Sequence, residues 1–199
     1  MSDDSYGYDP FYLLDESDNI EQEIKEIAIA LVAMPPSTHD VFWLQGARNI
    51  LTGALLHFYS QGFSFIKTII TIQETPTNSL VNQIFQNDLS KRYVTSYMEL
   101  DDKVLGGIIG EVGNSISVFA TDKNIQKTLT KSAIITPQDL ENGHDIFLSI
   151  PEDKLRQWKG LLTLMVSQFL NHFERRSDGK NTPVLFLLDE FPRLGMQGK

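Results

Sequence analysis

The sequence predicts a mainly α-helical protein with a smaller α/β part near its C-terminal end. Apolar residues recur at helical spacing between residues 37 and 131, and no strand pattern interrupts them. Two short, continuous apolar runs follow at 146–150 and 184–188, on either side of a long amphipathic stretch at 154–176. Continuous apolar runs joined by a helix are typical of parallel strands that are buried on both faces and connected by a right-handed crossover. We therefore expect three parts: an acidic lead with a first helix (1–36), an all-α region (37–131) and a strand–helix–strand part (132–199).

Two helices are expected in the N-terminal third, behind an extended lead with one short apolar island at 11–14. Asp18 and Glu21 form a variant of the capping box that marks a helix start, and Pro35 supplies the stop. The second helix has a wide apolar face and ends near Gly62.

The rest of the chain continues this pattern. A β-branched stretch at 64–74 is predicted to be helical because helices flank it. A turn is expected at Gly143, ahead of the first strand. Arg175 and Arg176 are placed where they favour the negative end of the long C-terminal helix. Other helices are expected at 77–86, 88–100 and 102–120.

Composition and charge exclude several classes of protein. The chain has 199 residues, 41% of them hydrophobic, which is enough for a sizeable core, and it has no cysteine for a disulfide framework or a thiolate metal site. No stretch approaches the roughly 20 apolar residues that span a bilayer, and the N-terminus lacks the order of a signal peptide, so we expect a soluble, cytoplasmic chain. Residues 1–40 hold ten acidic residues and one lysine, which accounts for the net charge of −9. Such a run is typical of a solvated face.

The most informative motif is VLFLLDEF, in which the apolar run 184–188 leads directly into Asp189 and Glu190. In a P-loop ATPase, the Walker B strand delivers an Asp to magnesium and a Glu to the attacking water in this way. An acidic residue at the end of an apolar strand is also common in α/β sheets, where it caps the next turn. From these residues alone, both interpretations stay open.

The phosphate-binding half of such a site, the Walker A or P-loop pattern G-x-x-x-x-G-K-[ST], is missing from the chain. The nearest match, GGIIGEVGNS, has Ile108 in place of the first glycine and Asn114 in place of the lysine. It follows no predicted strand, so we interpret it as a turn or a helix contact. No zinc site is expected, because the histidines are scattered along the chain at His39, His57, His144 and His172.

Three stretches carry a resemblance that covers most of the chain, from about Asp9 to Gly195. In order they are DVFWLQGARNILTGALLHFY, NSISVFATDKNIQKTLTKSAIITPQDLENGHDIFLSIPEDKL and PVLFLLDEFPRLG. Together they resemble the conjugative coupling proteins, the TraG/TraD-like ATPases of type IV secretion. The order and spacing of the stretches are more specific than any single motif except the last. The chain departs from the family pattern at Pro192 and Arg193, where a small residue is usual, and it lacks the family's N-terminal membrane helices.

The resemblance implies that the chain is an internal part of a motor ATPase. In the family, an all-α domain is inserted in a RecA/FtsK-like nucleotide-binding domain between Walker A and Walker B. Residues 37–131 would be that insert, and the Walker A would lie upstream of Met1. The parent protein would use ATP and magnesium, with Asp189 as the magnesium ligand and Glu190 as the catalytic carboxylate. The chain alone would bind no nucleotide and would be inactive.

The resemblance also implies partners. The parent would be a hexameric DNA and protein translocase at the cytoplasmic face of the bacterial inner membrane, and its insert would recognise a relaxase or a relaxosome accessory protein. Weak DNA binding at most is expected from the insert itself, because residues 37–131 hold eight basic and eight acidic residues. The best candidate for a DNA contact is a stripe of Lys123, Lys127 and Lys131 at helical spacing.

Two alternatives stay open at this point. The chain fits a stand-alone, non-catalytic helical module for protein interaction, in which Asp189 and Glu190 only end a strand. It also fits an FtsK/HerA-like DNA translocase outside conjugation, although such a protein would not be expected to carry an all-α insert of this length.

Overall fold

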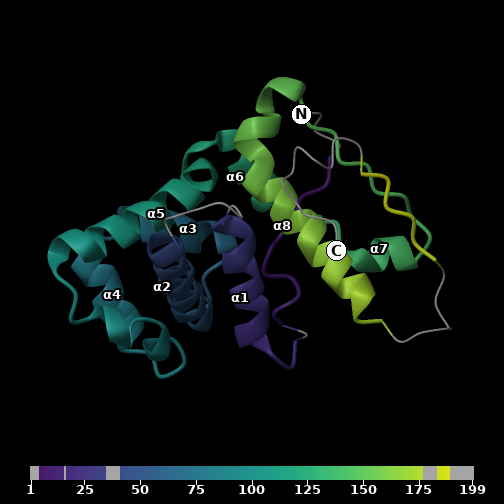
Figure 1. Cartoon of the computed structure of the whole chain (residues 1–199). Coiled ribbons are helices and arrows are strands. Elements are labelled where there is room, and N and C mark those ends of the chain that lie inside the picture. The colour runs from purple at the N-terminus through teal and green to yellow at the C-terminus, as the bar shows by residue number, and fades with distance from the viewer. Residues whose placement is uncertain (1–4, 16, 35–40, 177–182, 189–199) are drawn as a thin grey trace.

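The computed structural model describes residues 5–15, 17–34, 41–176 and 183–188, which form a mainly helical protein (Figure 1). This part of the fold prediction is confirmed. The helices are α1 (Ile20–Leu31), α2 (Val41–Ser60), α3 (Phe65–Glu74), α4 (Thr77–Phe85), α5 (Asp102–Thr121), α6 (Lys123–Leu129), α7 (Pro137–Glu141) and α8 (Leu155–Glu174). Short 3₁₀ turns lie at Lys91–Tyr93, Thr95–Tyr97 and Glu152–Lys154.

Helix α1 begins one residue later than the capping-box pattern indicates. Its N-cap is Asn19, whose side chain accepts a hydrogen bond of 3.1 Å from the backbone N–H of Gln22. Asn is as good an N-cap as Asp, because its side-chain oxygen satisfies one of the first free N–H groups. The prediction that Asp18 and Glu21 form the cap is therefore wrong, although the helix itself is confirmed.

Helix α2 is the centre of the helical part, where it packs against α1, α3, α4 and α5. Eleven of its residues are buried, from Gly46 to Phe58. Two of its glycines allow close approach of neighbours. A Cβ at Gly46 would lie 3.0 Å from Ile108 of α5, and one at Gly53 would lie 2.8 Å from Ile84 of α4. The helix ends at Ser60, just before the expected break at Gly62, which has a positive φ of 76°.

Helix α5 is the one helix among the described residues that is long and apolar enough to cross a membrane. Length and composition alone set that criterion, and a core helix meets it equally well. One face of α5, with Leu105, Ile108, Val112, Ile116 and Phe119, is buried against the protein. The helices on that side are α2 and α3.

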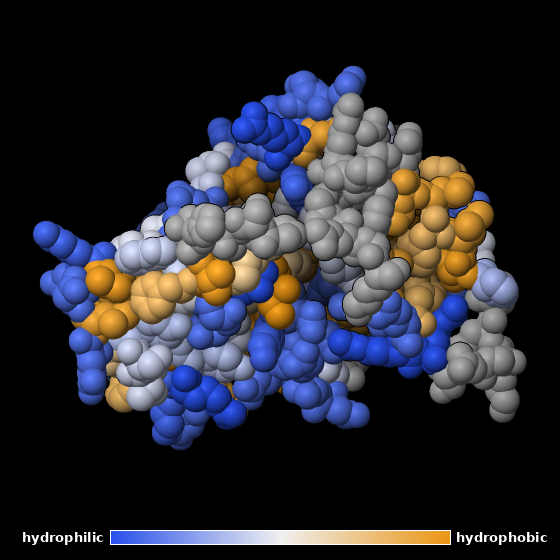
Figure 2. Space-filling view, viewed as in Figure 1, coloured by the Kyte–Doolittle hydropathy of each residue, from blue (hydrophilic) through white to orange (hydrophobic). Residues whose placement is uncertain are grey.

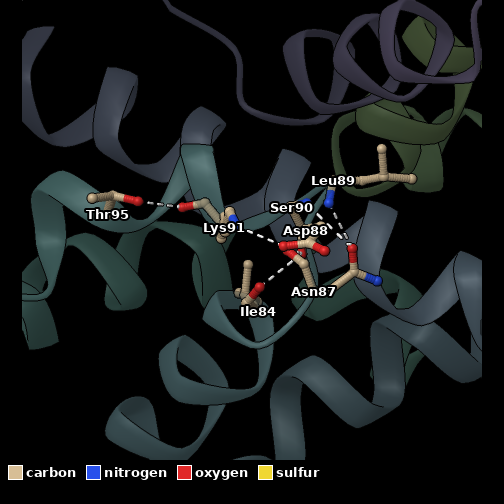
Figure 3. Close-up of polar contacts among 7 residues, drawn as sticks. All are labelled: Ile84, Asn87, Asp88, Leu89, Ser90, Lys91 and Thr95. Carbon is tan, nitrogen blue, oxygen red and sulfur yellow. Dashed lines mark hydrogen bonds and ion pairs between the residues drawn. The ribbon is translucent and has the colours of Figure 1, made fainter.

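The segment 88–100 does not form the expected helix. Instead, the side-chain oxygen of Asn87 accepts hydrogen bonds from the N–H groups of Leu89 (2.9 Å) and Ser90 (3.4 Å), as Figure 3 shows. The Ser90 hydroxyl is buried and donates to the carbonyl of Ile84 at 2.7 Å. Asn and Ser side chains offer the backbone an alternative to helical hydrogen bonds. The chain consequently breaks into two 3₁₀ turns here.

The N-terminal lead is part of the core rather than an exposed arm. Tyr8, Phe11 and Leu14 are all buried. The Tyr8 hydroxyl donates to the side chain of Gln168 in α8, and Phe11 makes edge-to-face ring contacts with Tyr59 and Phe65 at 5.4 Å. The lead therefore connects α8 with α2 and α3. These residues belong to the same continuous apolar core as the helices.

The two expected strands are not formed in the described part of the chain. Residues 144–150 and 183–188 are extended, but no backbone hydrogen bond joins them there, and the sole β contact is an isolated bridge between Gly7 and Ile134. The predicted α/β part is thus wrong for these residues. A buried parallel strand needs paired neighbours and covered faces, and here the two segments lie on one side of α8 (Figure 1).

Candidate functional site: the approach to Asp189 and Glu190

Asp189 and Glu190, the predicted metal ligand and catalytic carboxylate, lie outside the described residues. The structure describes the segment that leads to them. In residues 184–188 the side chains alternate: Leu185 and Leu187 are 79% and 84% exposed, whereas Val184, Phe186 and Leu188 are partly covered. Alternation with a period of two is the signature of an extended strand-like backbone, whose successive side chains point to opposite faces.

The covered face of this segment turns toward helix α8. The ring of Phe186 meets that of Phe173 at 5.6 Å with a 70° angle between the planes. Behind it, the guanidinium of Arg176 lies 4.5 Å from the centre of the Phe173 ring. An edge-to-face ring pair with a cation over one ring contributes stabilisation beyond that of burying the apolar surface. Phe186 is therefore the residue that anchors the extended segment 183–188 to α8.

The rest of the contact between this segment and α8 is loose. A cavity of about 1080 Å³ separates α8 from the two extended segments. Apolar side chains of α8, among them Leu162, Met165 and Val166, line one wall, and residues 146–150 and 185–188 line the other. Phe147 is 88% exposed beside it. Figure 2 shows the resulting apolar surface on this side of the molecule.

The C-terminal end of α8 is held by ionic and polar contacts that the sequence analysis missed. Arg175 donates to Glu23 of α1, while Arg176 and His172 lie 3.5 and 3.3 Å from Glu141 of α7. Basic residues there also favour the negative end of the helix dipole, as expected. The sequence contains a signal for these contacts. Residues 1–40 carry the whole net charge, so their acidic side chains are expected to pair with basic residues in other parts of the chain.

The N-terminal end of α8 is fixed by Trp158. Its indole N–H donates to the carboxylate of Asp122 at 3.0 Å, and Asp122 also caps α6. Burial raises the pKa of Asp122, but the hydrogen bonds from Trp158 and from two backbone N–H groups outweigh it, so the pKa is lowered overall. The carboxylate stays ionised and holds the α5–α6 junction against α8.

The stretch GGIIGEVGNS, which resembles a P-loop, lies inside helix α5. This agrees with its interpretation as a helix contact. A Cβ at Gly107 would lie 2.7 Å from the ring of Trp43, which explains that glycine by packing. Asn114 faces solvent on the same helix. Since a phosphate cradle needs a loop before a helix N-terminus, this stretch is no part of a nucleotide site.

No metal centre is formed by the described histidines and carboxylates. His57 is buried and contacts Gln61 at 2.8 Å, His172 contacts Glu141, and His144 lies 3.3 Å from a backbone carbonyl. His39 lies outside the described residues.

The lysine stripe is shorter than its spacing indicates. Lys123 and Lys127 lie on α6, but the helix ends at Leu129. The ammonium of Lys131 instead donates to the backbone carbonyl and the hydroxyl of Ser5, in the N-terminal lead. The expected row of three lysines on one helix is therefore wrong.

A family model for type IV secretory system conjugative DNA transfer matches residues 4–197 of the chain. The chain therefore belongs to this family of coupling ATPases, as the three stretches of sequence indicate. No curated protein and no solved structure matches it.

Proposed function

We propose that this chain is the part of a conjugative coupling ATPase that joins a helical recognition insert to the Walker B end of the motor. The observation that carries the proposal is the family match over residues 4–197, combined with an extended segment, apolar on both faces, that leads into Asp189 and Glu190. The parent protein acts at the bacterial inner membrane as an ATP-driven translocase of DNA and protein.

The exposed side chains of the extended segments support this assignment. Leu185, Leu187 and Phe147 are all largely exposed. Apolar surface on both faces of an extended segment is typical of a central strand in a parallel sheet, covered by helices on either side. In the proposal, other parts of the nucleotide-binding domain provide the neighbouring strands and the second layer.

In this proposal Glu190 polarises the attacking water and Asp189 binds magnesium. Magnesium typically binds one or two carboxylates, several waters and the phosphates of the nucleotide rather than a cage of protein ligands, so in this proposal one carboxylate from the chain suffices. The P-loop amides and lysine that bind the phosphates come from outside this chain.

The test is the variant Glu190→Gln in a longer protein of this family that contains both this chain and a P-loop. We expect hydrolysis to fall by at least about 100-fold while ATP binding is retained, because the carboxylate acts on the water and not on the bound nucleotide. Glu174→Gln, an exposed change at the end of α8, is the matched control and should leave the rate unchanged. A normal rate of ATP hydrolysis in Glu190→Gln would mean that Glu190 only ends the extended segment. That result would favour the alternative of a stand-alone interaction module.

The partner of the helical part is proposed to be a protein, a relaxase or an accessory protein of the relaxosome, rather than bare DNA. Residues 37–131 have no net charge, and Lys131 is already engaged by Ser5. Sequence-independent DNA binding draws on phosphate neutralisation, which such a surface supplies poorly. A gel shift at ~0.15 M salt should therefore show no sub-micromolar binding to DNA. Tight binding that Lys123→Glu and Lys127→Glu abolish would instead make α6 a DNA contact.

A further inference from the structure

Helix α1 lies between the insert helix α2 and the C-terminal helix α8, and it packs against both (Figure 1). Two of its acidic residues, Glu21 and Glu23, stand in its first turn. Side chains two positions apart on a helix point to nearly opposite sides. These two carboxylates therefore serve different neighbours.

Glu21 contacts the 3₁₀ turn of the insert. The hydroxyl of Tyr93 donates to its carboxylate at 2.6 Å, and the guanidinium of Arg92 lies 3.5 Å away. Burial and then the hydrogen bond to Glu21 raise the pKa of Tyr93 to about 12, so the hydroxyl remains a donor at any physiological pH.

Glu23 contacts α8 on the other side. Its side chain is 12% exposed, and it accepts a charge-assisted hydrogen bond from Arg175, the C-cap of α8. Two residues earlier, Phe173 meets Phe186, the anchor of the segment that runs to Asp189. Charge-assisted hydrogen bonds of this kind are roughly twice as strong as neutral ones.

We propose that α1 is a coupling element, which passes displacements of the C-terminal end of α8 to the 3₁₀ turns at 91–97 through Glu23 on one side and Glu21 on the other. The contacts run from Phe186 to Phe173, along α8 to Arg175, across to Glu23, along about half a helical turn of α1 to Glu21, and on to Tyr93. Each is a ring contact, a hydrogen bond or a stretch of rigid helix.

The receiving turn is suited to report such a displacement. Asn87 and Ser90 fix its backbone by the hydrogen bonds of Figure 3, and the side chain of Asn87 also donates to Ser60 of α2 at 2.8 Å. Leu89, two residues before these 3₁₀ turns, is 56% exposed. A shift of the turn would thus change the exposed surface of the insert without unfolding it.

The direction of the signal, from the hydrolysis site to the insert, rests on the proposed function. The coupling itself does not, so it is tested on this chain, which needs no ATP. Amide hydrogen exchange is measured at residues 91–97 and 172–176 in Glu23→Gln, Arg175→Gln and Tyr93→Phe. Glu26→Gln, on the same helix and at a carboxylate that accepts a hydrogen bond from Gln22 within that helix, is the matched control.

Coupling between two sites is reciprocal. We therefore expect Glu23→Gln and Arg175→Gln to speed exchange about fivefold at 91–97, and Tyr93→Phe to do the same at 172–176. The control and the reference amides of Val112 and Ile116 in α5 should stay within about twofold. The double variant Glu23→Arg with Arg175→Glu swaps the two charges and should restore slow amide hydrogen exchange at 91–97.

Three results would overturn the proposal. Faster exchange confined to the side of the mutation would make the contacts local. An equal rise at the α5 reference amides would mean a general loss of stability. If the charge-swapped double variant did not restore slow hydrogen exchange at 91–97, the ion pair between Glu23 and Arg175 would not be part of the coupling. In each case the result is independent of whether Glu190 supports hydrolysis.

Discussion

Leucines in two regions of this molecule have opposite surroundings. In the helical body, which comprises α1–α6, α8 and residues 5–15, Leu51 and Leu55 of α2 are fully buried. In the extended pair, which comprises residues 144–150 and 183–188, Leu185 and Leu187 are 79% and 84% exposed. Helices α1, α3, α4 and α5 pack against α2, whereas the extended pair borders α8 across a large cavity. The helical body thus buries most of its large apolar side chains within itself, whereas the extended pair leaves several of its own exposed.

The largest expected difference between the two regions is in unfolding free energy. Leu55→Ala should cost about 3 kcal/mol, because it leaves a cavity among packed helices. Leu187→Ala removes the same atoms from an exposed site and should change stability by less than about 0.5 kcal/mol. Urea unfolding of the two variants measures both. A loss above about 1.5 kcal/mol for Leu187→Ala would show that the extended pair is packed in this chain.

The helical body could be predicted because its signals are local. The apolar periodicity of α2, the Gly62 stop and the β-branched helix α3 all follow from neighbouring residues. The lead could not be placed, since the burial of Tyr8 depends on Gln168, 160 residues away. The 3₁₀ turns were missed because the side chain of Asn87 competes with helical hydrogen bonding.

The candidate site could be predicted as a motif but not as a geometry. The apolar run before Asp189 indicates a strand, and its alternation is indeed that of an extended segment. Strand pairing, however, depends on neighbours that the run does not specify. The ionic contacts of Glu21, Glu23 and Arg175 were also missed, because sequence spacing does not show which distant charges meet.

Two glycines should give effects of opposite sign within the helical body. Gly53→Ala places a Cβ 2.8 Å from Ile84 and 3.1 Å from Tyr93, so we expect a net loss of about 1–3 kcal/mol. At Gly110 nothing lies within 4 Å of the added Cβ, and Gly110→Ala should stabilise α5 by about 0.5–1 kcal/mol. Thermal unfolding distinguishes the two. A stabilising Gly53→Ala would mean that the turn at 91–97 does not press on α2.

The smallest expected effect is a pH dependence that arises in the helical body. Burial lowers the pKa of His57 from its usual value of 6.5. The unfolded chain therefore binds a proton at His57 that the folded chain does not, between the lowered pKa and 6.5. This contribution to stability is present above pH 6.5 and is lost as pH falls toward the lowered pKa.

The check is urea unfolding at pH 7 and pH 5 in the wild type and in His57→Gln. The wild type should lose more stability on acidification than the variant does, and the difference should be a fraction of the Leu55→Ala effect. Equal losses would mean that His57 carries its proton in the folded state. Replacing the exposed His144 with Gln is the matched control.

Hydrogen exchange at residues 184–188 and 50–55 tests the contrast between the two regions most directly, in this chain and in a longer protein that includes the P-loop. We expect slow exchange at 50–55 in both proteins, because α2 is enclosed by its own chain. Residues 184–188 should exchange rapidly in this chain and at least about 100-fold more slowly in the longer protein, where neighbouring strands pair with them. Equal protection of 184–188 and 50–55 in this chain alone would contradict the account.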